Sequence, residues 1–189
     1  MYPLARSPDD PIHGVPVPLK AAKPLVLTDA LLTSFDTNER INQYLLDNLP
    51  AEAWRVDPPG GKGRDIASIA AHMHNVRVMW LKAAGGKPSL ERDSKIPAQL
   101  DRARLTAAQA RKGLAESHAA LRKVLETSLA ADGRIRSFRP DVVGFIGYLI
   151  AHDAHHRGQI AMLARQAGHP VSQKTMFGMW EWGSRGAAD

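Results

Sequence analysis

Apolar residues that recur every three or four positions are the feature that most constrains the fold of this chain. Four long segments show this helical period: residues 28–49, 65–85, 106–132 and 141–168. No segment shows the alternation of apolar and polar residues, bounded by turn signals, that is typical of a half-buried strand. The sequence therefore predicts an all-α protein, a four-helix bundle without a sheet.

Residues typical of helix starts stand at the beginning of each segment. The expected N-caps are Thr28 or Asp29, Asp65, Thr106 and, directly after Pro140, Asp141. Gln109 follows Thr106 at the spacing of a capping box. Pro50 and Gly168 are the expected stops of the first and last helices. The connection from residue 85 to residue 105 is about 20 residues long, which permits a long crossover rather than a tight hairpin.

The length of the chain and the position of its prolines define its domain organisation. A chain of 189 residues can bury a core of its own, so one domain is sufficient. Residues 1–24 contain six of the 13 prolines and are expected to form an extended arm. Residues 25–170 should form the bundle, and residues 171–189 an aromatic tail that packs on the bundle or on a second subunit.

Composition excludes several classes of site. The chain has no cysteine, so a metal ion would have to be held by histidine, aspartate or glutamate. The net charge is +6, but the basic residues are spread from Arg6 to Arg185, which argues against a nucleic-acid surface and leaves it as a minor alternative. No apolar run approaches the roughly 18 residues of a membrane span, and the N-terminus lacks the apolar region of a signal peptide. We therefore expect a cytoplasmic protein without a membrane partner.

Three of the eight histidines lie in the stretch HDAHHRGQI, residues 152–160. At about 100° per residue, His156 lies about 40° from His152 on a helix, and both fall within the apolar stripe that contains Leu149. His155 falls on the flank of this stripe, and Arg157 is expected on the outer face. The spacing is compatible with a metal site, and also with a hydrogen-bonded pair in the core or polar residues on a wet face.

A third ligand would have to come from another helix. The second segment offers His72, at the edge of its apolar stripe, and His74, which points away from that stripe. His72 is therefore the candidate, with a histidine at the bundle boundary as the alternative. Three imidazoles leave open positions on a divalent ion, which can then activate water or hold a thiolate. Zinc, nickel and ferrous iron all suit such ligands.

Other polar residues near these positions are candidates for supporting roles. Asn75 is placed on the same helix face as His72. Gln159 could hydrogen-bond near an ion or simply line the bundle, and His155 could carry a proton or simply meet solvent. His118 lies on an apolar stripe and is interpreted as a core or boundary histidine.

Three stretches of the chain resemble the DinB-like (DinB/YfiT) superfamily of metal-dependent proteins. They are LLTSFDTNERINQYLLDNLP, IASIAAHMHNVRVMWL and IGYLIAHDAHHRGQIAMLARQAGHP, which together span residues 28–170. The most specific part is the motif H-x-x-x-H followed by R-G-Q. The chain departs from the family pattern in its proline-rich arm and its tryptophan-rich tail.

The resemblance implies an up-down-down-up bundle, frequently a homodimer, with one metal ion held by His72, His152 and His156. Family members with known activity are similar to transferases and isomerases that use a low-molecular-weight thiol. We therefore expect an enzyme that uses zinc or nickel to activate a thiol or water, for thiol transfer to a small molecule or for hydrolysis. The alternative is a non-catalytic metal-binding module of a stress response.

Overall fold

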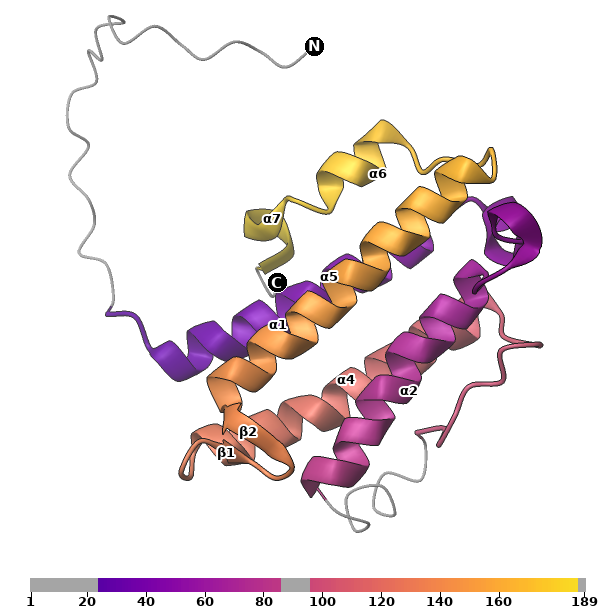
Figure 1. The fold of residues 1–189 in the computed structure, drawn as a ribbon. Coiled ribbons are helices and arrows are strands. Elements are labelled where there is room, and N and C mark those ends of the chain that lie inside the picture. The colour runs from indigo at the N-terminus through magenta and orange to yellow at the C-terminus, as the bar shows by residue number, and fades with distance from the viewer. Residues whose placement is uncertain (1–23, 86–95, 187–189) are drawn as a thin grey trace, which may run out of the picture.

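Four long helices dominate the computed structural model, which describes residues 24–85 and 96–186. They are α1 (Leu27–Asp47), α2 (Ile66–Gly85), α4 (Ala107–Leu129) and α5 (Val142–Gln166). Helices α1 and α5 run in one direction along the bundle, and α2 and α4 run in the other (Figure 1). The end of α2 and the start of α4 therefore lie at opposite ends of the bundle. This arrangement confirms the predicted all-α bundle, its up-down-down-up order and its long crossover.

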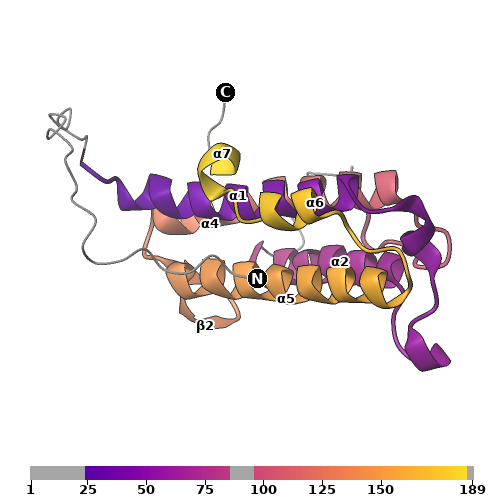
Figure 2. The ribbon, with the colours of Figure 1, turned by 90° about the horizontal axis from the view of Figure 1, so that it is seen from above.

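The helices form two layers. Seen from above, α1 and α4 lie in one layer and α2 and α5 in the other (Figure 2). Helix α2 packs against both α4 and α5, and α1 packs against the same two helices. Residues of α2 and α5 that face each other therefore meet across a short distance although they are distant in the sequence.

Three of the predicted caps are present. The carboxylate of Asp65 accepts a hydrogen bond from the backbone N–H of Ser68 at 2.7 Å at the start of α2. The Asp141 side chain accepts from the N–H of Gly144 at the start of α5. The Thr106 capping box at the start of α4 is complete. These bonds satisfy amide groups that have no partner within the helix.

The start of α1 differs from the prediction. The helix begins at Leu27, and Val26 occupies the cap position without a side-chain hydrogen bond. Asp29 lies in the first turn, where its negative charge is stabilised by the positive end of the helix dipole. The expectation that Thr28 or Asp29 caps this helix was wrong, because the helix extends past both.

The prediction of no sheet was also wrong. Strands β1 (Arg134–Ile135) and β2 (Phe138–Asp141) form an antiparallel hairpin between α4 and α5. Its tight turn places Ser137 at a φ of 68°. The strands contain two and four residues, and only Ile135 is fully buried, so the sequence has no room for a detectable alternation.

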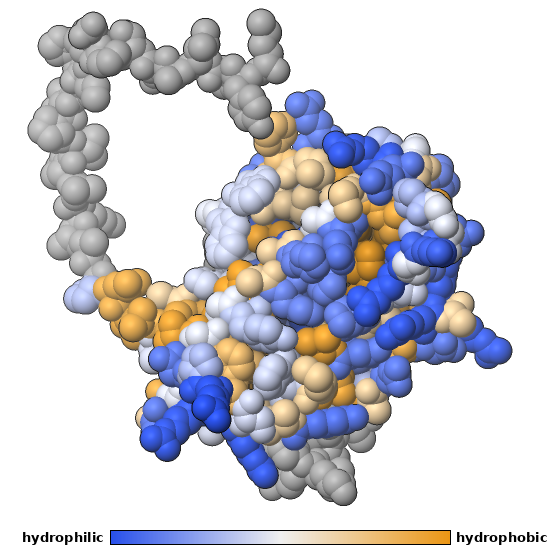
Figure 3. Space-filling view, viewed as in Figure 1, coloured by the Kyte–Doolittle hydropathy of each residue, from blue (hydrophilic) through white to orange (hydrophobic). Residues whose placement is uncertain are grey.

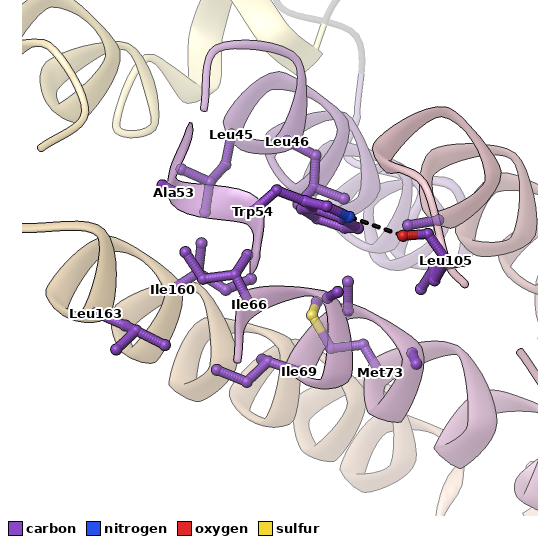
Figure 4. Close-up of a cluster of buried hydrophobic side chains, with 14 of the residues drawn as sticks. Leu45, Leu46, Ala53, Trp54, Ile66, Ile69, Met73, Leu105, Ile160 and Leu163 are labelled. Atoms are coloured by element: carbon purple, nitrogen blue, oxygen red, sulfur yellow. Dashed lines mark hydrogen bonds between the residues drawn. The ribbon is translucent and has the colours of Figure 1, made fainter. Parts of the chain in front are cut away.

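Buried apolar side chains form two clusters, one toward each end of the bundle. Figure 4 shows the cluster beside the short helix η1 (Ala51–Arg55), in which the Trp54 indole N–H donates to the Leu105 carbonyl at 2.8 Å. The second cluster surrounds Phe35 and Phe145 beside the hairpin. Between the two clusters, each long helix also buries polar side chains, among them Asn38, Arg77, Ser117 and Asp153.

Two short helices, α6 (Gln173–Gly178) and α7 (Trp182–Gly186), follow the bundle. Helix α7 packs on α1, where the Arg185 guanidinium lies 3.5 Å from the centre of the Tyr44 ring. Phe177 and Trp180 point outward and are 64% and 78% exposed. The division of the chain into arm, bundle and tail stays a prediction.

The surface mixes polar and apolar residues, as Figure 3 shows for one face. One apolar patch lies at the start of α1, where Leu25, Val26 and Leu27 are more than half exposed. Among the described residues, none of the helices combines the length and apolar character that crossing a membrane requires.

Candidate metal centre

Three histidines from two neighbouring helices converge in the middle of the bundle. His72 lies in the first half of α2, and His152 and His156 lie on consecutive turns of α5. The centre of the His72 ring is 5.4 Å from that of His152 and 4.8 Å from that of His156. The structure thus brings together the three residues that the sequence singled out.

The ring nitrogens are close enough to share one ion. One nitrogen from each of the three rings lies within 4.8 Å of the other two. The Nε2 atoms of His152 and His156 are 3.2 Å apart. Nitrogen ligands lie about 2.1 Å from zinc, so two of them are at most about 4.2 Å apart. A small rotation of a side chain closes the widest separation, and the three residues fit a single divalent ion.

Gln159 determines which nitrogen of His156 faces the centre. Its side-chain Oε1 lies 2.7 Å from His156 Nδ1. Because an amide oxygen only accepts, Nδ1 carries the proton, and the Nε2 lone pair faces His152. The Gln159 side chain therefore orients this ring in the tautomer that a metal ligand needs.

The surroundings favour the neutral form of two of the rings. Burial, the charge of Arg64 and the neighbouring histidines together lower the pKa of His72 to about 4. Burial also lowers the pKa of His156, more than the hydrogen bond to Gln159 raises it. Both rings are neutral at pH 7, which is the form that binds a metal.

The remaining candidates lie at different distances from the centre. His155 is exposed, and its ring centre is 5.0 Å from that of His156. Asn75 points elsewhere: its Oδ1 accepts from the backbone N–H of Leu100, and the residue lines a hollow with Met79.

Two other histidines are buried but separate from this group. Both ring nitrogens of His74 lie 2.9 Å from backbone carbonyls, those of Gly113 and Pro97, so this residue points toward α4. It was expected to point away from the apolar stripe, yet it is fully buried because these carbonyls satisfy its ring. His118 lies 2.8 Å from Asp36 through its Nε2 atom, in agreement with its interpretation as a core or boundary residue.

The polar layer beside the histidines was not predicted. Asp153, which follows His152, is 2% exposed. Its Oδ2 atom accepts from the amides of Asn38 and Asn42 at 2.7 and 2.8 Å. The Arg77 guanidinium donates to the same oxygen at 2.7 Å. Three residues from α1 and α2 thus meet at one buried carboxylate on α5.

Charge pairing determines the ionisation of this layer. Burial alone would raise the pKa of Asp153, but Arg77 and the hydrogen bonds to the carboxylate hold it well below its usual range. Burial alone would lower the pKa of Arg77, but the charges of Asp153 and Glu39 raise it. Glu39 Oε2 lies 2.7 Å from the guanidinium. The layer therefore contains one arginine cation between two carboxylates.

The expectation for Arg157 was wrong. Its guanidinium is half-buried and donates to the side-chain oxygens of Asn38 at 2.7 Å and Asn42 at 2.5 Å. The side-chain N–H groups of the two asparagines donate to Asp153, and their side-chain oxygens accept from Arg157. The arginine thus lies over the polar layer because its long side chain reaches back to α1.

This layer adjoins the histidines through Asp153. Its second oxygen, Oδ1, lies 3.7 Å from His152 Nδ1, which is longer than a hydrogen bond. Because Oδ2 is taken by three donors, Oδ1 is the oxygen that faces the ring. A carboxylate behind a histidine favours a proton on Nδ1 and leaves Nε2 for a ligand.

Comparison with known families agrees with this arrangement. The model of the DinB family matches residues 23–184, which is most of the chain. A search of curated proteins gave no match. Because the matched region contains all four long helices and all three histidines, the chain belongs to the DinB family.

Proposed function

We propose that the protein holds one zinc or nickel ion at His72, His152 and His156 and is a metal-dependent enzyme that acts on a small molecule. The observation that carries this proposal is the convergence of one nitrogen from each of three imidazoles, on two helices, within 4.8 Å. Imidazole suits both metals. The family match supports metal binding, and the reaction is the step that we add.

The chemistry follows from the ligand set. When bound, an ion with three nitrogen ligands keeps open positions at which it lowers the pKa of water or holds a thiolate. The hydrogen bond to Gln159 keeps the His156 ring oriented, and the Asp153 carboxylate lies behind the His152 ring. His155 is exposed beside them and is the candidate to carry a proton between reactant and solvent. The proposed reactions are transfer of a low-molecular-weight thiol to an electrophile, and hydrolysis.

A purely structural role for the ion has less support. The bundle already contains two apolar clusters and a buried hydrogen-bonded layer that links α1, α2 and α5. These contacts tie the helices together without a metal. A single-domain fold of this kind does not need a metal to supply its core. We therefore favour an ion that serves chemistry.

Metal content and turnover test the proposal. Protein purified without a histidine tag is stripped with a chelator, reloaded with zinc or nickel, and analysed for bound metal. Variants His72→Ala, His152→Ala and His156→Ala are compared with His169→Ala, which lies outside the group. Loaded and stripped protein are then assayed with low-molecular-weight thiols plus electrophiles, and with esters.

We expect one ion per chain in the wild type and in His169→Ala, loss of the ion in the other three variants, and turnover only when metal is present. An ion without any metal-dependent turnover would favour a non-catalytic binding module. Failure to bind either metal would overturn the proposal. The homodimer and the cytoplasmic location stay predictions, tested by light scattering and by fractionation.

A further inference from the structure

A cavity of about 580 Å³ lies beside the histidines, between the loop that precedes α2 and the last turns of α5. Its wall combines two cations, Lys62 and Arg64, with the apolar side chains of Ile69, Met162 and Leu163. Its volume is within the range of sites that bind small molecules. Smaller hollows of about 290, 340 and 500 Å³ lie elsewhere on the bundle.

The cavity is lined by residues that adjoin the histidine group. Gln159, which lines it, is hydrogen-bonded to His156. Ile69, on the opposite wall, lies one helical turn before His72 on α2. A molecule in the cavity would therefore contact the residues next to two of the three histidines.

The charge of the wall is one-sided. Lys62 and Arg64 are exposed, and no carboxylate lines the cavity among the described residues. The nearest acidic residue along the chain, Asp65, caps α2 and lies 3.4 Å from Arg55, so its charge is already partnered. By contrast, the hollow of about 290 Å³ on α4 is lined by both acidic and basic side chains, such as Glu116 and Lys112.

The backbone holds the two cations at the rim. They belong to the segment PPGGKGR, in which Gly60 and Gly61 have φ angles of 78° and 67°, a region that favours glycine. Two prolines precede these glycines and restrict the loop further. The positions of Lys62 and Arg64 over the cavity therefore follow from the turn itself.

We propose that this cavity binds the substrate of the histidine centre, and that this substrate is a small anion with a short apolar stem. Its carboxylate or phosphate pairs with Lys62 and Arg64, and its stem lies on Ile69, Met162 and Leu163. This inference rests on the proposed function for the reaction, but the binding step needs no metal.

Binding of simple probes to metal-free protein tests the inference. Hexanoate, hexanol and hexylammonium share one stem and differ in the charge of the head group. Titration of each, followed by amide chemical shifts of the chelator-treated protein, gives three dissociation constants. We expect hexanoate to bind at least tenfold more tightly than hexanol, to weaken with added salt, and to shift the amides of residues 62–69 and 159–166.

Variants separate the charge from the apolar wall. Lys62→Ala/Arg64→Ala should weaken hexanoate binding at least tenfold and leave hexanol binding unchanged. Lys62→Glu/Arg64→Glu should bind hexylammonium in preference to hexanoate. The matched control, Lys112→Ala/Arg134→Ala, removes two exposed cations from other parts of the surface and should behave as the wild type.

Two results would overturn the inference: equal affinity for hexanoate and hexanol, or hexanoate binding that survives Lys62→Ala/Arg64→Ala. An absence of binding by all three probes would overturn it as well. Metal analysis of the same variants keeps the two proposals apart. In Lys62→Ala/Arg64→Ala, weaker hexanoate binding with one ion still bound supports both proposals. In the wild type, no hexanoate binding with one ion bound refutes the cavity assignment alone, whereas no metal binding with hexanoate bound refutes the proposed function alone.

Discussion

The guanidinium of Arg77 on α2 lies 2.7 Å from the carboxylate of Asp153 on α5, and both side chains are at most 3% exposed. Charged groups this deeply buried are costly unless they are paired and hydrogen-bonded. Here each charge has several partners: Arg77 also contacts Glu39 and the Leu114 carbonyl, and Asp153 accepts from two asparagines. The pair therefore fixes the relative position of α2 and α5, the two helices that carry the histidines.

Replacement of Arg77 by methionine should destabilise the fold strongly. Methionine fills a similar volume but leaves Asp153 and Glu39 buried without their cation, which costs about 3 to 5 kcal/mol. Urea unfolding at pH 7 measures the change. The control is Arg111→Met, which removes a partly exposed arginine paired with Asp47 and should cost less than about 1 kcal/mol. Equal losses in the two variants would contradict the role assigned to the buried pair.

Gln159→Leu should weaken metal binding without unfolding the protein. The change removes the acceptor that holds His156 Nδ1, so the ring is free to rotate and to change tautomer. Loss of such a partner reduces metal affinity about 10- to 100-fold. Competition with a chromogenic chelator measures the affinity, and Gln166→Leu, the same change in the same cavity wall, serves as control. Wild-type affinity in Gln159→Leu would refute this account of the ring.

Much of the bundle could be predicted because its signals are local. The capping box of Thr106 and the cap of Asp141 each involve residues three positions apart, and both are formed. The hairpin was missed because its strands are too short to show alternation. The first cap was misplaced because a helix can begin without a side-chain cap: at the start of α1 the Val26 carbonyl accepts from the Ala30 N–H, and no side chain caps the helix.

The site could be predicted in part. Helix geometry placed His152 and His156 on one face and preferred His72 to His74, and the three candidate residues do lie together. The polar layer was missed because Asn38, Asn42 and similar residues are usually exposed. A signal was present, since both occupy the stripe that Phe35 and Leu45 continue at spacings of three and four residues. Their partners on α2 and α5 lie far away in the sequence and cannot be identified from spacing.

The pair of Asp36 and His118 should make stability depend on pH. Burial raises the pKa of Asp36, but hydrogen bonds from His118 and Arg122 outweigh it and hold the pKa below its usual value of 3.8. Because the folded pKa is lower than the unfolded one, the contribution of the carboxylate is complete above about pH 4 to 5 and is lost as the pH falls through the folded pKa.

Asp36→Asn should therefore lower the free energy of unfolding by about 1 kcal/mol at pH 7, since the pair is partly exposed and screened by solvent. The difference from the wild type should shrink as the pH falls below 4. Urea unfolding at pH 7, 5, 4 and 3 measures it, with the exposed Asp57→Asn as control. A difference that stays constant between pH 7 and pH 3 would show that ionisation of Asp36 is not the cause.

The contact between Gly178 and Tyr44 should control whether the C-terminal helices stay on α1. A Cβ atom at position 178 would lie within 3 Å of the Tyr44 ring and its hydroxyl, whereas one at Gly183 would meet nothing within 4 Å. Gly178→Ala must displace a ring on which the Arg185 guanidinium is stacked. Because α7 is held to α1 through this stack, the tail should open more often, by about tenfold if the stack contributes about 1.4 kcal/mol.

Hydrogen exchange of the amides in residues 173–185 measures this opening, and cleavage by a protease that cuts after Arg185 gives a second readout. Gly183→Ala is the matched control: it makes the same change in a helix of the same tail, but without a clash, and should leave exchange unchanged or slower, since alanine favours a helix. In the double variant Tyr44→Ala/Gly178→Ala, the Cβ atom has no ring to meet and Arg185 has no ring to stack on. Its exchange rate therefore reports the loss of the stack without the clash. If Gly178→Ala exchanges no faster than Gly183→Ala, the tail is held by contacts other than the one with Tyr44.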